Sequence, residues 1–498
     1  MNLSLLLEMA LEAMPERRVL GGARDGLSYA AFDARVRAAQ VKLAQTPAER
    51  TAYLGLNSPS LAVALYASAR LGRAFAPLNY RLTDAELARL VARTAPAVLI
   101  ADDDMAARVP AVEGVTVMTR SAFDALPDCQ GEAPSVWADE SDVAILLFTS
   151  GTTGEPKAAT LRHSNLASYV ISTVELAGSD PDEAALVSVP PYHIAGMSGL
   201  ITGLYGGRRI VHLPAFTAEA WIEAVQREGV THAMVVPTML QRIIDELEAK
   251  DLHLQTLRHL SYGGGRMPTT VIERALRRMP HVDFVNAYGL TETSSTVSVL
   301  TPDDHRAAFH SEDPLVRRRI GSVGRPLPHL ELEVRGPQGE TLGAGEAGEI
   351  WVRGDQVAGE YVGRKVLRDD GWFPTNDGGW MDEEGYLFVE GRLDDVIVRG
   401  GENISPGEVE DVLRAHPAVA DVAVLGLPDE QWGEKVAAVV VARQPVAEAE
   451  LRNWARERLR STKTPEVVIF RTALPYNDTG KLLRRVLKTE LSAAPATA

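Results

Sequence analysis

Between about residues 50 and 300, short apolar stretches alternate with amphipathic ones, and this alternation constrains the fold more than any other feature of the sequence. Thr83 and Glu86 have the spacing of a capping box, which opens a helix that we expect to run through Thr94. The apolar stretch 97–101 follows as a strand. A regular succession of strands and helices is typical of a parallel sheet covered by helices. The fold class that we predict is therefore α/β, with parallel-type sheets.

The pattern changes after about residue 320, where short alternating strands such as 349–353 are separated by turns rich in glycine, aspartate and proline. This texture predicts a β-rich subdomain over about residues 320–393. A compact mixture of short strands and helices follows. We therefore predict a large domain, 1–393, that includes the β-rich subdomain, and a small α+β domain, 394–498, at the C-terminus.

The composition excludes several classes of function. A net charge of -16 argues against a general nucleic-acid binder and gives no basic face for an anionic membrane. No apolar run approaches the ~20 residues of a membrane span, and no cysteine and histidine cluster has zinc spacing. The single cysteine, Cys129, cannot form an intrachain disulfide, and the first residues lack the basic region of a secretory signal. We therefore expect a cytoplasmic protein whose anionic ligands are held by a local site.

A loop rich in glycine and hydroxyl residues follows the apolar stretch 143–148. Glycines let backbone N–H groups turn toward an anion, hydroxyls add donors, and a lysine adds a mobile positive charge, so the loop predicts a phosphate site. A Walker A loop would need Gly-Lys-Ser/Thr, whereas here Pro156 precedes Lys157 and Ala158 follows it. The phosphate-binding residues that we predict are Thr149, Ser150, Gly151, Thr152, Thr153, Gly154 and Lys157.

Two further strand ends carry unusual residues. The stretch 260–262 is followed by three glycines, and the stretch 282–287 is followed by a tyrosine, a threonine and a glutamate within 288–293. Ligands in open α/β sheets lie outside the carboxyl ends of the strands, so we expect these loops to share one cleft with the phosphate loop. Taken alone, each loop is equally compatible with an ordinary turn.

Taken together, the motifs resemble those of one known superfamily. The order Ser-Gly-Thr-Thr-Gly-x-Pro-Lys at 150–157, Tyr-Gly-Leu-Thr-Glu at 288–292 and Gly-Arg-Leu-Asp-Asp at 391–395 is similar to that of the acyl-adenylate-forming enzymes, which include acyl-CoA synthetases, peptide-synthetase adenylation domains and beetle luciferases. Six such motifs span residues 148–481. The resemblance implies that a carboxylate attacks the α-phosphorus of ATP bound with Mg²⁺, which gives an acyl-adenylate, and that the thiol of CoA then expels AMP.

The resemblance also implies roles in a nucleotide site. Tyr288 would stack on adenine, Thr291 would donate to the α-phosphate, and Glu292 would bind Mg²⁺, which prefers carboxylate, water and phosphate oxygens. Asp377 and Arg392 would hold the ribose. The other residues implied at this site are Gly263, Gly264, Gly265, Asn286, Ala287 and Gly289. Next to Asp377, the chain has Asn376 where most relatives have glycine.

The C-terminal motifs imply a mobile domain. Asp394 matches the family's hinge, about which the C-terminal domain would rotate between the two half reactions. Gly400 and Gly401 would then lie along the pantetheine arm of CoA, with Trp432 on its nucleotide. Lys481, in a Gly-Lys pair, would bridge the attacking carboxylate and the phosphate in the first half reaction.

The acyl substrate is the least defined part of the prediction. His193 resembles the family residue that lies between the adenylate and the acyl group, where it would gate the carboxylate or contact the acyl chain, although a histidine in an apolar loop is also a common core residue. Small residues after it leave room for a bulky acid, so medium-chain, aryl and polycyclic acids are all compatible. The acyl-site residues that we predict are His193, Ile194, Met197, Tyr262, Gly263, Gly289 and Thr293.

Several functions remain open on these residues. The length of the chain and the absence of appended carrier sequence favour a free-standing acyl-CoA synthetase, as a monomer or homodimer. An acyl-AMP ligase that loads a carrier protein is the nearest alternative, and a luciferase-like oxygenase is less favoured because no residue is set aside for O₂. A catalytically silent ATP- or acyl-binding protein is the alternative from another class. Against that alternative stand the retained Lys157, Glu292, Asp377, Arg392 and Lys481.

Overall fold

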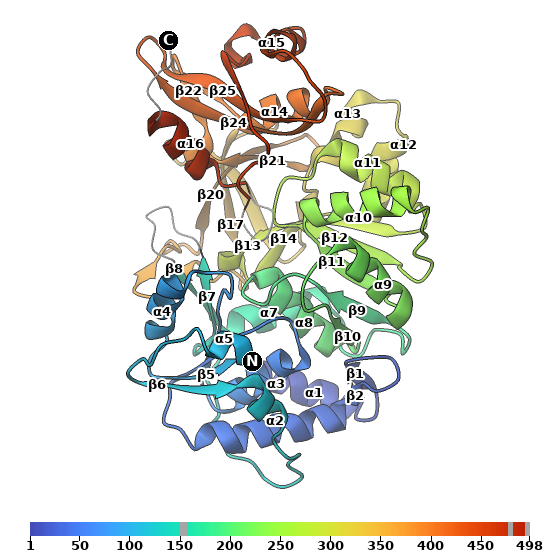
Figure 1. The fold of residues 1–498 in the computed structure, drawn as a ribbon, viewed down its shortest axis with the longest axis vertical. Helices are drawn as coiled ribbons and strands as arrows, with labels where there is room; N and C mark the ends of the chain where they lie inside the picture. The colour runs from blue at the N-terminus through green and yellow to red at the C-terminus, as the bar shows by residue number, and fades with distance from the viewer. Residues whose placement is uncertain (150–156, 477–481, 494–498) are drawn as a thin grey trace.

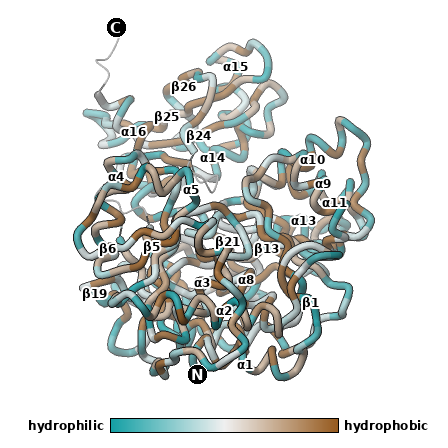
Figure 2. The backbone as a smooth tube through the Cα atoms, turned by 60° about the horizontal axis from the view of Figure 1, so that its bottom comes forward, coloured by the Kyte–Doolittle hydropathy of each residue, from teal (hydrophilic) through white to brown (hydrophobic). Residues whose placement is uncertain are grey.

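The computed structural model describes residues 1–149, 157–476 and 482–493. Figure 1 shows a large lower body that contains the N-terminus and a smaller C-terminal unit, coloured orange to red, above it. In Figure 2, the hydrophilic segments run along the outline of the molecule. The large body and the C-terminal unit correspond to regions whose strand and helix patterns differ in the sequence.

The first large sheet has nine strands. In pairing order they are β15 (Arg325–Pro326), β14 (Ser295–Leu300), β13 (Asp283–Leu290), β12 (His259–Gly263), β11 (His232–Val235), β9 (Ala184–Val187), β10 (Arg209–His212), β1 (Arg18–Leu20) and β2 (Leu27–Ser28). Strands β13 to β1 are parallel, whereas β14, β15 and β2 are antiparallel to their neighbours. The carboxyl ends of β12 and β13 therefore lie side by side.

The second large sheet has eight strands. In pairing order they are β19 (Arg364–Lys365), β18 (Glu360–Tyr361), β8 (Lys157–Arg162), β7 (Val143–Thr149), β4 (Ala74–Pro77), β3 (Arg50–Leu54), β5 (Ala97–Ala101) and β6 (Val115–Thr119). The strands from β7 to β6 are parallel, and β8, β18 and β19 extend the sheet in antiparallel fashion. Strands β18 and β19 come from a segment some 200 residues after β8, so this edge joins distant parts of the chain.

One hydrophobic core joins the two sheets, since Ile145 of β7 and Ile210 of β10 belong to the same buried cluster. The helices that contribute to it are α1 (Leu3–Ala13), α2 (Tyr29–Ala44), α3 (Pro59–Arg70), α6 (Arg120–Asp124), α7 (His163–Thr173) and α8 (Ile194–Gly206). The opposite face of the nine-stranded sheet is covered by α9 (Ala218–Glu228), α10 (Pro237–Ala249), α11 (Thr269–Arg278) and α12 (Pro302–His310), which the short α13 (Pro314–Arg317) follows. The opposite face of the eight-stranded sheet is covered by α4 (Asp84–Ala92) and α5 (Asp103–Ala106).

Two smaller sheets complete the chain. An antiparallel sheet, the β-rich part, contains β16 (Glu331–Arg335), β17 (Gly348–Arg353), β20 (Phe373–Met381) and β21 (Leu387–Arg392). The C-terminal unit contains β22 (Ile397–Arg399), β23 (Glu402–Ile404), β24 (Val419–Asp429), β25 (Gly433–Ala442) and β26 (Val467–Phe470), with α14 (Pro406–Arg414), α15 (Glu448–Arg456) and α16 (Arg484–Ala493). In this structure, α14 packs against β21, and Arg266 Nη2 of the body lies 2.5 Å from Asp411 Oδ2.

The predicted α/β fold class is confirmed, with parallel-type sheets, a β-rich part and a smaller C-terminal unit. The capping box of Thr83 and Glu86 is present, and the strand 97–101 is β5. The helix between them ends at Ala92 and not at Thr94; Pro96 disfavours helical backbone at Ala95, so the helix has to stop before that residue. The boundary between 393 and 394 stays a prediction. Within the described ranges, the helices are all too short or too polar to cross a bilayer.

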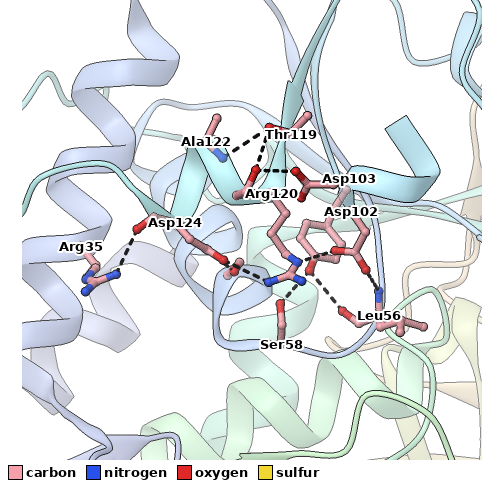
Figure 3. A network of polar contacts seen from close by, with 12 residues as sticks. Arg35, Leu56, Ser58, Asp102, Asp103, Thr119, Arg120, Ala122 and Asp124 are labelled. Atoms are coloured by element: carbon pink, nitrogen blue, oxygen red, sulfur yellow. Dashed lines mark hydrogen bonds and ion pairs between the residues drawn. The ribbon is translucent and has the colours of Figure 1, made fainter. Parts of the chain in front are cut away.

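A buried carboxylate, Asp102, fastens the carboxyl end of β5 to two neighbouring segments (Figure 3). It accepts the backbone N–H of Leu56 at 3.0 Å and Arg120 Nε at 2.5 Å. Arg120 also reaches Asp124 Oδ2 at 3.1 Å, which fixes the short helix α6. The loop after β3 and helix α6 are therefore held through one side chain.

We predict that Asp102→Ala lowers the free energy of unfolding by about 2 kcal/mol, because a buried N–H and a partly buried guanidinium lose their acceptor. Denaturant unfolding of the variant measures this. Arg227→Ala is the control: its side chain is exposed, and its second partner, Glu228, keeps the Ala23 N–H and Arg209, so the change should stay below about 0.5 kcal/mol. Equal effects of the two substitutions would contradict the assignment.

Candidate active site

The glycine loop and the exit of β13 meet because β12 and β13 are in parallel register. Gly263 pairs with Ala287, and a Cβ on Gly263 would lie 2.2 Å from the Ala287 carbonyl oxygen. Only glycine fits there. Gly264 has a φ of +76°, which again favours glycine. The two strand exits that the sequence singles out are thus adjacent.

The predicted metal ligand, Glu292, lies in a short 3₁₀ turn, Thr291–Thr293, directly after β13. Its carboxylate accepts a hydrogen bond from the hydroxyl of Tyr361 on β18, and its backbone carbonyl accepts the N–H groups of Ala358 and Gly359 at 2.9 and 3.0 Å. Glu292 is thereby attached to the edge of the eight-stranded sheet.

The same tyrosine links Glu292 to the base of the phosphate loop. Lys157 Nζ lies 5.8 Å from the centre of the Tyr361 ring, and Lys157 is paired with Thr149 across the β7–β8 hairpin. Tyr361 itself pairs with Ala159 of β8. Lys157, Tyr361 and Glu292 therefore form one cluster, although they come from three separate segments.

A second carboxylate cluster lies on the β-rich sheet. Asp377 of β20 accepts the Tyr288 hydroxyl at 2.7 Å and pairs with Arg392 Nε of β21 at 3.0 Å. Arg392 Nη1 donates to the Thr375 carbonyl at 2.8 Å. The predicted adenine and ribose residues Tyr288, Asp377 and Arg392 are thus in direct contact with one another.

Electrostatics keep these groups in complementary charge states. Burial alone would lower the pKa of Arg392, but the carboxylates of Asp377 and Glu292 raise it overall, so the guanidinium stays charged. Burial, and then the Asp377 charge, raise the pKa of Tyr288 well above its usual value. Burial and Glu292 likewise raise the pKa of Tyr361. Both tyrosines therefore stay protonated and donate to carboxylates.

His193 precedes helix α8, and its ring lies 4.5 Å from that of Tyr192. The Ser198 hydroxyl of α8 lies 3.1 Å from that of Ser295 on β14, which places the start of α8 beside the exit of β13. Ile194 is partly buried against the core shared by the two sheets, and Met197 lies fully within it.

The structure places three of the predicted acyl-site side chains elsewhere. Tyr262 faces the opposite side of the nine-stranded sheet, where its hydroxyl lies 2.8 Å from His305 Nε2. Thr293 is fully buried and its hydroxyl bonds to the backbone of Leu290 and Ser295. Met197 points into the shared core. Strand alternation and turn capping, which the motif pattern does not reveal, set these directions.

Gly289 and Asn286 also have structural neighbours. A Cβ on Gly289 would lie 1.8 Å from the Ser295 carbonyl oxygen, so this glycine permits the tight β13–β14 pairing. The Asn286 amide donates to the Ser322 carbonyl at 3.0 Å and is buried.

The predicted hinge residue, Asp394, has a contact that the sequence does not predict. Asn376 has a φ of +60°, a left-handed conformation that asparagine tolerates better than most residues, and its side-chain amide donates to Asp394 Oδ2 at 2.9 Å. Farther on, the Gly400 N–H donates to the Trp432 carbonyl at 2.8 Å, and the Trp432 ring covers Gly400. Gly401 is exposed beside it.

Some predicted residues lie outside the described ranges. They are Ser150, Gly151, Thr152, Thr153, Gly154 and Lys481. Conversely, the motif reading misses Tyr361. Its only sequence signal is an aromatic residue two positions after Gly359. The pairing of β18 with β8, which brings Tyr361 to the site, joins segments too far apart in the chain to be predicted from a local pattern.

Comparison with known proteins identifies the family. A family model described as AMP-binding enzyme matches residues 7–362, and one described as AMP-binding enzyme C-terminal domain matches residues 408–481. The chain belongs to the AMP-binding enzyme family. The described parts of this AMP-binding enzyme include the base of the phosphate loop, the glycine loop and the two carboxylate clusters.

Relatives of this AMP-binding enzyme are similar along most of their length. The feruloyl-CoA synthase of an Amycolatopsis species is 38% identical over 474 residues, with 92% of each chain covered. The indoleacetate–CoA ligase of Aromatoleum aromaticum is 34% identical over 480 residues, covering 92% of this chain and 91% of the ligase.

A solved relative has the same fold. The o-succinylbenzoate CoA synthetase of Bacillus subtilis in complex with its acyl-adenylate intermediate superposes with a TM-score of 0.84 at 28% identity, over 98% of both chains. The same synthetase in complex with ATP and magnesium ion gives a TM-score of 0.81 at 29% identity, over 97% of this chain and 99% of that one.

We predict that Gly263→Ala lowers the free energy of unfolding by about 3 kcal/mol, because the added methyl group must push β12 away from Ala287. Gly265→Ala is the matched control, since a Cβ there meets only Pro237 atoms at 3.8 and 3.9 Å, which is ordinary contact. Thermal or denaturant unfolding separates the two. Similar stabilities for both variants would show that the strand contact does not constrain the loop.

Proposed function

We propose that this AMP-binding enzyme is an ATP-dependent acyl-CoA synthetase, which joins a carboxylic acid to AMP and then transfers the acyl group to the thiol of CoA. The observation that carries the proposal is the convergence of Lys157, Glu292 and the Asp377–Arg392 pair near the exits of β12 and β13. The relatives named as CoA synthases and ligases, aligned over nine-tenths of the chain, support it.

The first half reaction makes a poor acyl donor reactive. A carboxylate oxygen attacks the α-phosphorus in line, the new P–O bond forms as the bond to pyrophosphate breaks, and the acid is left as a mixed anhydride with AMP. Asp377 and Arg392 would hold the ribose, and Thr291 would donate to the α-phosphate. Bound Mg²⁺ would neutralise phosphate oxygens, and Glu292 offers the carboxylate that this hard ion prefers.

Only one protein carboxylate is needed for this ion, because the triphosphate supplies other oxygens. Within the described ranges, no group of three or more acidic, histidine or cysteine side chains is arranged as a metal cage. The Glu292 carboxylate, held by the Tyr361 hydroxyl, fits a site that is completed by substrate oxygens and water.

The second half reaction forms the thioester. The sulfur of CoA attacks the acyl carbon, the C–O bond to the phosphate breaks, and AMP leaves. Gly400 and Gly401 would accommodate the pantetheine arm, with Trp432 beside it, after the C-terminal domain rotates about Asp394. The acid would enter beside His193. Assembly as a monomer or homodimer and a cytoplasmic location stay predictions.

The test is AMP and pyrophosphate release with ATP, CoA and a panel of acids. We predict that Lys481→Ala lowers pyrophosphate release about 100-fold or more, because the attack loses its bridging charge. A supplied acyl-adenylate should still react with CoA at close to the normal rate. Lys488→Ala removes another lysine, which lies on α16 and pairs with Glu434 of β25; this control variant should leave both half reactions intact.

The outcomes separate the alternatives. Equal loss of both half reactions in Lys481→Ala would contradict the proposal that Lys481 acts only in adenylate formation. Adenylate formation with transfer to a carrier protein but not to CoA would favour a carrier ligase. ATP binding with no turnover of any acid would favour a silent binding protein.

We predict that Asn376→Gly shifts the C-terminal domain away from the present orientation about fivefold, because the bond to Asp394 is worth about 1 kcal/mol and glycine keeps the left-handed backbone. Asn376→Asp should shift it further, since it places a second carboxylate beside Asp394. Energy transfer between dyes on the two domains measures the populations. Identical distributions in all three proteins would show that this contact does not restrain the hinge.

A further inference from the structure

A cavity of about 160 Å³ lies between helix α8 and the sheet face that turns toward it. Helix α8 contributes Ala195, Gly199 and Thr202, and strands β9, β11 and β12 contribute Ala185, Met234 and Ser261. These side chains are small or flexible, so the space between helix and sheet stays open. The cavity begins two residues after His193, where the acid would enter.

Gly199 is the helix position that keeps the cavity open. A Cβ on Gly199 would meet no atom within 4 Å, whereas one on Gly203, a turn later, would lie 2.4 Å from Ile210 Cδ1. Gly203 therefore allows α8 to pack closely on the strands, whereas the missing side chain at Gly199 leaves the cavity open.

The cavity is long enough for an extended group. Ala185 and Ser188 both line it, and three residue steps along a strand correspond to ~10 Å. An apolar cavity of about 150 Å³ accepts benzene in another protein. The space thus accommodates one aromatic ring, or a chain of similar volume, lying along the strands.

The far end of the cavity, at the amino ends of the strands, is polar. It is lined by Arg208, His232 and His259, and the two imidazoles stack with centroids 4.5 Å apart. Arg208 Nε lies 2.7 Å from Glu183 Oε2, so its charge is already compensated. His232 Nδ1 lies 2.8 Å from the Thr231 hydroxyl.

The end wall carries hydrogen-bonding groups, and its guanidinium is already paired with the carboxylate of Glu183. Burial, and then the charge of Arg208, lower the pKa of His232 to about 3, so this imidazole is neutral at neutral pH. A second carboxylate there would meet two carboxylates already in place, because Glu183 pairs with Arg208 and Asp283 Oδ2 lies 3.5 Å from His259 Nδ1. A hydroxyl or carbonyl group could instead bond to the imidazoles and the guanidinium edge.

We propose that this cavity receives the acyl group and that its far end selects elongated acids, with room for one ring, whose distal end carries an uncharged hydrogen-bonding group. The inference rests on the proposed synthetase function. Gly199 leaves room for the acyl group, and His232 and His259 form hydrogen bonds with its distal end. The His232 side chain is only 17% exposed, so a polar substrate end beside it supplies a hydrogen-bond partner that an apolar end would not, and this discriminates more strongly than apolar fit.

The test compares kcat/KM for CoA-dependent AMP release with four acids: 4-hydroxycinnamic, cinnamic and 4-carboxycinnamic acids, and propionic acid, which ends before Gly199. The wild type should prefer the hydroxylated acid over cinnamic acid by at least about tenfold and over the diacid by more. In Gly199→Leu, the ratio of cinnamic-type acids to propionic acid should fall at least about tenfold. Gly131→Leu, on an exposed glycine whose Cβ also meets nothing, is the matched control.

Two variants at the polar end of the cavity test whether the imidazoles recognise the distal group of the acid. His232→Phe and His259→Phe keep a stacked ring but remove the imidazole nitrogens, so the preference for the hydroxylated acid over cinnamic acid should fall to about twofold or less in at least one of them, without a matching loss for cinnamic acid. Unfolding midpoints check that the variants fold.

Each result bears on the proposal. No hydroxyl preference in the wild type, a preference for the diacid, or unchanged ratios in Gly199→Leu would overturn it while leaving the synthetase function intact, since propionic acid or another acid still turns over. Absence of AMP release with every acid would instead overturn the function on which the inference depends.

Discussion

The parallel register of β12 and β13 is the constraint on which the site depends. Gly263 lies so close to the Ala287 carbonyl oxygen that no side chain fits between them, and both strands end at the same edge. The glycine loop and the residues from Tyr288 to Glu292 are therefore brought together by backbone pairing and not by side-chain contacts. Parallel strands buried between helices are rigid, so the chemistry of the loops rests on a fixed base.

A second constraint connects the two large sheets. Tyr361 lies on an added edge strand, where it pairs with β8 and donates to Glu292 beyond β13. Its ring also lies near Lys157 at the base of the phosphate loop. A cation on the eight-stranded sheet and a carboxylate next to the nine-stranded sheet are thus kept in position by one phenol. Any relative movement of the sheets would disturb both groups at once.

Local patterns in the sequence predict much of this architecture. The capping box at Thr83, the strand 97–101 and the α/β class are confirmed, because they depend on residues near one another in the chain. The direction of Tyr262 could not be predicted, since it depends on which face of the sheet is covered by α8. Tyr361 was missed for a related reason: its role arises from pairing between segments 200 residues apart. Asn376 departs from the family pattern, and its contact became evident only from the structure, in which its amide donates to Asp394.

The structure separates the choice of acid from the proposed rotation of the C-terminal domain. The named residues of the α8 cavity lie between Ala185 and Ser261, within the large body, whereas the contact of Asn376 with Asp394 lies at the predicted hinge. Asp377 and Arg392, which we propose to hold the nucleotide, lie next to that contact, since Asn376 precedes Asp377 on β20. Under the two proposals, changes in the cavity would alter which acid is held without touching the predicted hinge, whereas changes at Asn376 would act on the nucleotide side of both half reactions. A chain built in this way can change its substrate through α8 and its facing strands while the parts that would use ATP stay the same.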